Sequence, residues 1–454
     1  MNKRFLIAIA IILVALLGVL LLVRSRRPTP GTITLKVIGE DYSPMQGLEK
    51  IKGDFTRETG IEVEISKFDA ETVRKKSIGD FQAGAANYDV IMGAFYDVGL
   101  FGSNGWVLNV DQSLNKPGWK DPAVDLNNFS PQILNLCCRY RDTLYALPCS
   151  AQSMYLWYRK DLFDSNTEKD AFKKKYGYDL PSPTPQRSMT WAQYKDVAEF
   201  FTRPKGASAA GKPLEQPLFG TVLQAKNHVA LWFEFNNFLR SFGGRFVSSD
   251  GKTVEIDSPA AKAALDYYIG LKKFSPPGTL NYTWDEALSA FQNGQIAMAI
   301  MWSDSISAVE DPKSSHVVGQ VGFAANPTLA EGGEAGSVFG GWGLFVNVRS
   351  HHPQEAVQLI QWVNRPDVQL KWAKEGGIPA TLSTYTSPQY TSIPGAQADL
   401  ESLKHLIGWS TEPYSARMIE VGQNNLAKAV AGDVTPEQAL KDLAVRIREI
   451  TASQ

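Results

Sequence analysis

Hydrophobic and polar residues alternate in a way that predicts strands and helices in turn along the first hundred residues after position 31. Positions 33 to 37 alternate apolar and polar, as a strand with one buried face does. After a loop at 39–45, apolar residues recur at helical spacing over 48–55, and Gly60 supplies a helix stop. Alternation returns at 61–65, and a short apolar run follows at 89–92, of the kind that parallel sheets bury. These residues therefore predict strand–helix–strand units.

Later helices are marked by their first residues. A Ser or Thr cap precedes each predicted helix, with Gln or Glu three residues on or Pro directly after it. These starts are Thr190 with Gln193, Ser258 with Pro259, Thr283 with Glu286, and Thr435 with Gln438. The third helix should run to about Gly294 and be followed by a strand over 297–301 that ends at Trp302. Apolar residues at 440, 443, 447 and 450 predict an amphipathic terminal helix.

Alternating strands and helices favour parallel or mixed sheets covered by helices. The chain has 454 residues, and because a single core stops growing near roughly 250 to 300 residues, we expect two lobes. In open α/β sheets ligands bind beyond the strand ends. The loops after Val37, Met92 and Met301 should therefore converge and carry the function.

The N-terminus contains an uninterrupted apolar run from Phe5 to Val23, preceded by Lys3 and Arg4. As a helix this run would span roughly 28 Å, enough to cross a bilayer. It is longer than the apolar region of a typical cleaved signal and has no small-residue cleavage site, so an uncleaved anchor is favoured over a signal peptide. No cysteine lies near it, which argues against a lipoprotein. Residues 24–32 then form an exposed linker.

Charge and composition exclude several classes of partner. The formal net charge of −1 includes five basic residues of the N-terminal segment, and the rest of the chain carries about −6. No basic field for nucleic acid remains. Cys137, Cys138 and Cys149 are the only cysteines; Cys138 and Cys149 flank a hairpin-like stretch, and a bridge between them is left open.

Candidate ligand contacts follow the predicted strands. Glu40 and Asp41 follow the first strand, Phe95 and Tyr96 follow the run at 89–92, and Trp302 is followed at once by Asp304. Carboxylates beside aromatic rings suit a sugar, because its hydroxyl groups need acceptors and its C–H faces need a flat apolar partner. A cap, a solvated charge or a core ring remains the alternative for each. Gly340 to Gly343 allows close backbone approach around Trp342, either to a ligand or in a bend between lobes.

Enzyme and cofactor signatures are weak. The five histidines have no ligand-like spacing, and no nucleophile elbow or phosphate-loop lysine is present. We therefore expect no catalytic residue, no metal and no cofactor. Carboxylate pairs alone do not exclude a glycosidase.

The order of segments resembles the family 1 extracellular solute-binding proteins of ATP-driven (ABC) importers, which include maltose-, trehalose- and polyol-binding proteins. The resemblance covers about 32–450. It rests on the segments 48–63 (LEKIKGDFTRETGIEV), 88–108 (YDVIMGAFYDVGLFGSNGWVL), 144–163 (LYALPCSAQSMYLWYRKDLF), 283–302, 340–346 and 435–447.

This resemblance implies an α/β, two-lobe periplasmic-binding-protein type II fold with ligand held between the lobes. The chain would cross between lobes near 148–152, 340–343 and Pro388. The implied organisation is an anchor or signal helix at 1–23, a linker at 24–32, a first lobe of 33–150 and 344–387, and a second lobe of 151–343 and 388–454.

The resemblance also implies further ligand contacts. Gln152 stands where relatives often carry an acid, which weakens the match to any one sugar. Gly341 and Trp342 lie in a crossover string found among sugar and polyol binders, and Tyr414 and Arg417 fall in a late segment that closes over the site in relatives.

The leading hypothesis is capture of an oligosaccharide, monosaccharide or polyol by hinge closure and delivery to the ABC permease, by a monomer on the outer face of the membrane or in the periplasm. A binding protein for glycerol phosphate, a peptide or a polyamine is the alternative. A secreted carbohydrate-active enzyme is a third hypothesis, which turnover of a glycoside would reveal.

Overall fold

The computed structural model describes residues 32–248 and 253–453 of the 454-residue chain. The predicted anchor at 1–23 and all but the last residue of the predicted linker lie outside these residues. Within the described part, no helix is both long enough and apolar enough to span a membrane.

A five-stranded mixed sheet forms the centre of the first lobe, in the order β2-β1-β3-β13-β6. Its strands are β1 (Thr34–Glu40), β2 (Glu62–Phe68), β3 (Val90–Ala94), β6 (Ala146–Ser150) and β13 (Trp342–Val346). β1 pairs in parallel with β2 and β3, whereas β13 runs antiparallel to β3 and β6. The mixed sheet expected from the alternating pattern is thereby confirmed, with one strand supplied from almost two hundred residues further along the chain.

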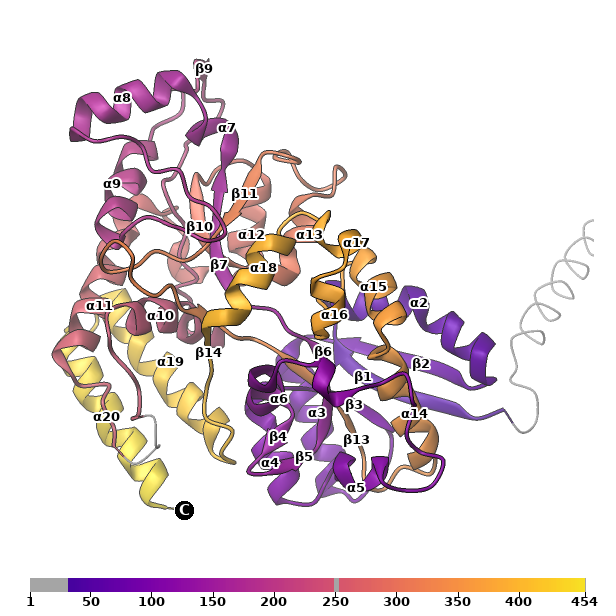
Figure 1. Cartoon of the computed structure of the whole chain (residues 1–454). Helices are drawn as coiled ribbons and strands as arrows, with labels where there is room; N and C mark the ends of the chain where they lie inside the picture. Colours follow the sequence, from indigo (N-terminus) through magenta and orange to yellow (C-terminus); the bar gives the residue numbers. More distant parts are fainter. Residues whose placement is uncertain (1–31, 249–252, 454) are drawn as a thin grey trace, which may run out of the picture.

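Helices and a small hairpin surround this sheet (Figure 1). They are α2 (Ser43–Thr59), α3 (Ala70–Gln82), the 3-10 helix η1 (Phe95–Asp97), α4 (Val98–Ser103), α5 (Val110–Leu114), η2 (Leu126–Asn128), α6 (Pro131–Cys137), β4 (Arg139–Tyr140) and β5 (Thr143–Leu144).

The second lobe contains a three-stranded antiparallel sheet of β10 (Met298–Trp302), β7 (Met154–Arg159) and β11 (Val321–Ala324), in that order. Helices that precede β11 in the sequence pack around it: α7 (Lys160–Phe163), α8 (Asn166–Tyr176), α9 (Trp191–Phe201), α10 (Val229–Ser241), α11 (Pro259–Gly270), η3 (Leu271–Phe274), η4 (Thr279–Asn281), α12 (Trp284–Gln292), η5 (Ser303–Ser305) and α13 (Ile306–Val309). The long C-terminal helices α19 (Ser415–Ala431) and α20 (Pro436–Ala452) lie beside α10 and α11 (Figure 1). A short hairpin, β8 (Ser208–Ala209) with β9 (Lys212–Pro213), lies apart from this sheet.

Consecutive strands of the chain belong to different lobes at two places. Residues 151–153 lead from β6 to β7, and residues 339–341 lead from β12 (Ser337–Val338) to β13. The two connections are joined by a hydrogen bond from the Gly340 amide to the Gln152 carbonyl, 2.9 Å long. A third segment, β14 (Leu406–Ile407), pairs with β12. The residue boundaries predicted for the two lobes stay a prediction.

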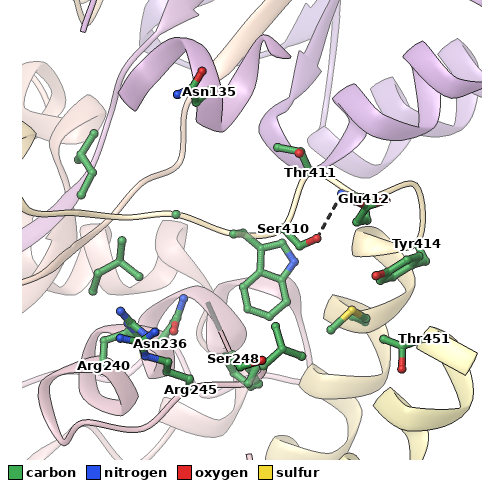
Figure 2. A pocket seen from close by; sticks show the side chains of 17 residues that line it. Asn135, Asn236, Arg240, Arg245, Ser248, Ser410, Thr411, Glu412, Tyr414 and Thr451 are labelled. Atoms are coloured by element: carbon green, nitrogen blue, oxygen red, sulfur yellow. Dashed lines mark hydrogen bonds between the residues drawn. The ribbon is translucent and has the colours of Figure 1, made fainter. Parts of the chain in front are cut away.

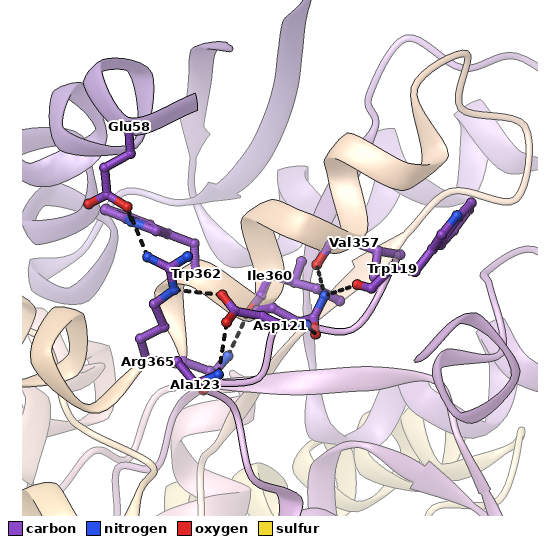
Figure 3. Close-up of polar contacts among 10 residues, drawn as sticks. Glu58, Trp119, Asp121, Ala123, Val357, Ile360, Trp362 and Arg365 are labelled. Carbon is purple, nitrogen blue, oxygen red and sulfur yellow. Dashed lines mark hydrogen bonds and ion pairs between the residues drawn. The ribbon is translucent and has the colours of Figure 1, made fainter. Parts of the chain in front are cut away.

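The late helices α14 (Pro353–Val363) and α15 (Pro366–Lys374) return to the first lobe, and polar contacts fix them there (Figure 3). Arg365 donates to Glu58 at 2.9 Å and to Asp121 at 2.6 Å. Gln361 accepts from the Asp121 amide at 2.7 Å and donates to the Trp119 carbonyl at 2.8 Å. Four short helices follow: α16 (Leu382–Tyr385), α17 (Pro388–Thr391), α18 (Ala396–Ser402) and η6 (Leu403–His405).

Most local predictions are confirmed. Thr190 and Thr283 form complete capping boxes, Ser258 caps α11, and Gly60 ends α2 with φ of 74°. The predicted box at Thr435 is only half formed, because Gln438 donates its side-chain amide to Asp442 instead.

One expectation needs correction, and the question left open about the cysteines is answered. The loop expected at 39–45 is shorter, because β1 continues to Glu40 and α2 already begins at Ser43. The three cysteines are buried free thiols, and Cys137 lies 3.4 Å from Cys138 between sulfur atoms, so Cys138 and Cys149 form no bridge in this structure.

Candidate functional site

Segments that follow β1, β3 and β10 carry acidic and aromatic side chains to the interface between the two lobes. Glu40 is the last residue of β1, η1 follows β3 directly, and η5 follows β10 directly. The charge of Asp304, in η5 of the second lobe, acts on Glu40 of the first lobe. The convergence expected for these three loops is therefore present, and we refer to Glu40, Phe95, Tyr96, Trp302, Asp304 and Trp342 with their packing partners as the interlobe cluster.

The two carboxylates of the cluster are held in an environment that favours their protonated forms. Burial, reinforced by the charges of Asp304, Asp285 and Asp69, raises the pKa of Glu40 to about 8. Burial, opposed by a hydrogen bond from Ser305 and reinforced by the charge of Asp285, raises the pKa of Asp304 to about 7. Two such groups can accept or donate a hydrogen bond near neutral pH, which suits recognition of hydroxyl groups.

Aromatic rings from both lobes meet in the same place. Phe233 of α10 packs edge-on against Trp302, with ring centroids 5.8 Å apart, and lies 5.7 Å from Phe95 and 6.3 Å from Tyr96. Trp342 packs against Tyr42 at 5.9 Å. Trp302 and Trp342 remain only 7% and 8% exposed, so a ligand that stacks on them would require the lobes to part first.

Gln152 and Gly341 lie in the two connections between the lobes. Gln152 is buried and accepts a hydrogen bond from the Ser150 hydroxyl. The Gly341 carbonyl accepts from the Phe95 amide at 3.1 Å. A Cβ at Gly341 would lie 1.9 Å from the Phe339 ring, so no larger residue fits there unless the ring moves. Glycine is needed at position 341 because the backbone passes close to the Phe339 ring, not because it approaches a ligand.

Three predicted contacts lie apart from the cluster. Asp41 is exposed, accepts a hydrogen bond from Gln46 at 3.1 Å and lies 3.8 Å from Lys67, as a solvated loop charge does. Tyr414 precedes α19 and lines a different groove, described below, while Arg417 is exposed on α19. Among the described residues, no hydrogen bond, ion pair or ring contact joins Tyr414 or Arg417 to the interlobe cluster.

A cavity of about 240 Å³ opens beside Asp304 between the two lobes. Residues 376–378 line it from one side, and residues 303–307 of the second lobe line it from the other. Asp399 of α18 also faces it and accepts hydrogen bonds from Tyr155 at 2.9 Å and Tyr390 at 2.7 Å. Burial raises the pKa of Asp399 to about 6. Room for a small solute thus exists next to the carboxylates of Asp304 and Asp399.

Sequence reasoning missed Tyr42 and Phe233 as members of the cluster. Tyr42 lies in the loop predicted at 39–45. It packs against Trp342 because β13 lies beside β3 in the sheet, and the local sequence pattern does not predict that position of β13. Phe233 lies in α10, where every residue from Ala230 to Leu239 is buried, so no stripe distinguishes the residue that faces the other lobe. Over residues 32–248 and 253–453, no group of three or more His, Cys, Asp or Glu side chains is arranged to hold a metal ion.

Two α/β lobes joined by crossing segments, with acidic and aromatic side chains buried between them, define a protein that binds a solute between its lobes. Comparison with known families agrees: residues 39–370 match the family described as bacterial extracellular solute-binding protein. The chain therefore belongs to this family of extracellular solute-binding proteins.

Known relatives resemble the chain over most of its length. A probable amino-acid ABC transporter periplasmic-binding protein of Sinorhizobium fredii, y4oP, is 23% identical over 91% of this chain and 88% of its own. The mannitol-binding protein of Pseudomonas aeruginosa is 25% identical over 83% of this chain and 79% of its own. In three dimensions, an ABC transporter solute-binding protein of Agrobacterium radiobacter in complex with ribitol superposes with a TM-score of 0.78 at 23% identity, covering 92% of this chain and 98% of the other.

Proposed function

We propose that the protein captures a sugar or polyol between its lobes by hinge closure and delivers it to an ABC permease. The observation that carries the proposal is the interlobe cluster, in which each lobe contributes a carboxylate and a tryptophan: Glu40 and Trp342 from the first, Asp304 and Trp302 from the second. Closure brings these four groups around one solute, so the affinity depends on both lobes at once.

The chemistry of the cluster matches a polyhydroxylated ligand. Hydroxyl groups donate to the carboxylate oxygens of Glu40 and Asp304, and the C–H faces of the ligand pack on Trp302 and Trp342. Gln152 adds an amide that both donates and accepts. The cavity beside Asp304 supplies space for the ligand.

Relatives support the same ligand class. The mannitol-binding protein and the ribitol complex both concern linear polyols. Amino acids are the competing class, because the y4oP relative is described as a probable amino-acid transporter component. A phosphorylated polyol is disfavoured in the cluster, because the charges that most affect Glu40 are all negative and a phosphate needs arginines or helix N-termini.

We further propose that the apolar run from Phe5 to Val23 tethers the protein to the outer face of the membrane. Its 19 residues suffice to cross the hydrocarbon core, which takes roughly 20. The lobes would then act as a monomer held near the permease.

A thermal-shift panel on the fragment 32–454 tests the ligand class. Mono- and oligosaccharides, polyols, amino acids and glycerol phosphates are compared at equal concentration and ionic strength. A compound that binds only the folded state must raise the melting temperature. We expect a rise with one sugar or polyol class; a rise confined to amino acids or phosphate esters would overturn the proposal.

A further inference from the structure

Residues of both lobes line a second groove, drawn in Figure 2. Its volume is about 550 Å³, more than twice that of the cavity beside Asp304. The walls come from α10, from residues 245–248 and from the strand-like segment 406–412, while Asn135 of α6 contributes from the first lobe. None of Glu40, Trp302, Asp304 or Trp342 lines this groove.

Asn236 is the first sign that the groove binds something. Its side chain is 4% exposed, yet it makes no hydrogen bond to any described residue, and it lies on the wall of the groove. Its amide atoms are not among the fully enclosed unpaired atoms, so they open onto the groove. The amide can therefore donate to and accept from a solute that enters there.

Two arginines stand beside this amide. Arg240 is one helical turn after Asn236 on α10, and the charge of Arg245 lies close enough to act on it. Burial lowers the pKa of Arg240, and Arg245 lowers it further. Neither guanidinium group forms an ion pair with another described residue. Figure 2 shows Asn236, Arg240 and Arg245 gathered on one side of the groove.

An aromatic surface completes the site. Trp409 also lines the groove and packs against Trp232 at 4.8 Å and Phe246 at 5.1 Å between ring centroids. The single acidic residue of the lining, Glu412, lies across the groove from the arginines (Figure 2). The end of the groove next to α10 therefore presents two guanidinium groups, although the charges of Glu255 and Glu334 also act on Arg240.

We propose that this groove is a second binding site, for a small organic anion that combines a carboxylate or phosphate with a flat apolar part. The anion would accept hydrogen bonds from Asn236, Arg240 and Arg245, and its flat part would cover Trp409. Charge-assisted hydrogen bonds to guanidinium groups are among the strongest in proteins, and aromatic stacking adds to them. Because Asn135 belongs to the other lobe, occupancy of the groove would respond to the angle between the lobes.

Benzoate, phenyl phosphate and the neutral benzyl alcohol are suitable probes. We expect the two anions to raise the melting temperature of the fragment 32–454 and to bind in titration calorimetry, with benzyl alcohol at least tenfold weaker. The stronger of the two anions decides between a carboxylate and a phosphate site. Crystals soaked in 4-bromobenzoate should show the anomalous signal of bromine beside Trp409.

Variants separate this site from the interlobe cluster. Arg240→Gln and Asn236→Leu should each weaken anion binding at least fivefold while leaving the response to sugars and polyols unchanged. Arg446→Gln, at an exposed position of α20, is the matched control and should change neither. The proposal would be overturned if benzyl alcohol bound as tightly as the anions, or if the bromine of 4-bromobenzoate were found away from Trp409. Binding at crystal concentration only would overturn it as well.

Discussion

At the scale of single residues, the unusual feature of the interlobe cluster is that two half-buried carboxylates from different lobes lie close enough for one charge to act on the other. A carboxyl group whose pKa is raised by folding binds more protons in the folded than in the unfolded state. Glu40 and Asp304 have pKa values of about 8 and about 7, against ordinary values of 4.5 and 3.8. The free energy of unfolding contributed by these groups is therefore highest in acid and falls as pH rises between about 4 and 8.

Asp304→Asn should remove part of this dependence. The variant should gain stability relative to the native sequence as pH rises from 5 to 8, by at least about 1.4 kcal/mol, the equivalent of one pKa unit. Urea denaturation of the fragment 32–454 at pH 5, 6, 7 and 8 measures the difference. Asp170→Asn, at an exposed position on α8, is the control. Parallel curves for Asp304→Asn and the native sequence would contradict the burial of this carboxylate.

The tryptophans of the cluster lead to a prediction about affinity. Trp302→Ala and Trp342→Ala should each weaken binding of the best compound from the thermal-shift panel at least tenfold, about 1.4 kcal/mol, because the stacking surface is lost. Trp302→Phe and Trp342→Phe should each keep part of the affinity that the alanine variants lose. Trp119→Ala is the control, because Trp119 is outside the cluster and its ring is covered by Lys116, whose Nζ lies 4.1 Å from the ring centroid. This variant should leave the affinity measured by calorimetry unchanged. Unaltered affinity in both cluster variants would remove these residues from the site.

Whether a member of the interlobe cluster could be predicted from the sequence depended on the pattern of the residues next to it. Trp302 could be found because it ends an apolar strand and is followed at once by a polar turn. Phe233 could not, since a helix buried on all sides gives no stripe that marks the face toward the other lobe. Asp41 was expected with Glu40, yet it lies just beyond the end of β1, is exposed and accepts a hydrogen bond from Gln46.

At the scale of elements, the helices α14 and α15 show how a late segment becomes part of the first lobe. Arg365 bridges Glu58 of α2 and the largely buried Asp121 across more than two hundred residues of sequence. Capping residues and strand periodicity predicted where elements begin and end. They did not predict that β13 inserts between β3 and β6, because local pattern carries no information on which strands become neighbours; only the family resemblance placed residues 344–387 with the first lobe.

Arg365→Met should therefore destabilise the protein. Asp121 would lose its charged partner at a mostly buried position, which costs roughly 1.5 to 3 kcal/mol. Lys371→Met, on the same α15, breaks an ion pair with Asp54 whose lysine side chain is 55% exposed, and such pairs contribute about 0 to 1 kcal/mol. Urea denaturation of both variants measures how much free energy of unfolding each one loses. Equal losses would show that the Arg365 contacts stabilise the protein no more than an exposed ion pair does.

At the scale of the whole molecule, binding by closure requires that the two lobes meet in a defined geometry. Gly99 of α4, in the first lobe, is one place where they meet. A Cβ at this position would lie 1.8 Å from the carbonyl oxygen of Thr411, in the segment that leads into α19. A backbone atom cannot move aside as a flexible side chain does, so any larger residue must separate α4 from this segment.

Gly99→Ala should therefore hinder closure without touching the interlobe cluster. We expect ligand affinity to fall several-fold and the radius of gyration of the ligand-saturated protein to rise in small-angle X-ray scattering. Gly53→Ala is the matched control, because it makes the same change in α2, where the nearest atom to the new Cβ is the end of the Arg57 side chain at 3.7 Å. A larger radius with weaker binding would tie affinity to closure. If the affinity of Gly99→Ala equals that of Gly53→Ala, contact between α4 and the segment before α19 is not needed for capture, and the closing motion must be stabilised by the cluster alone.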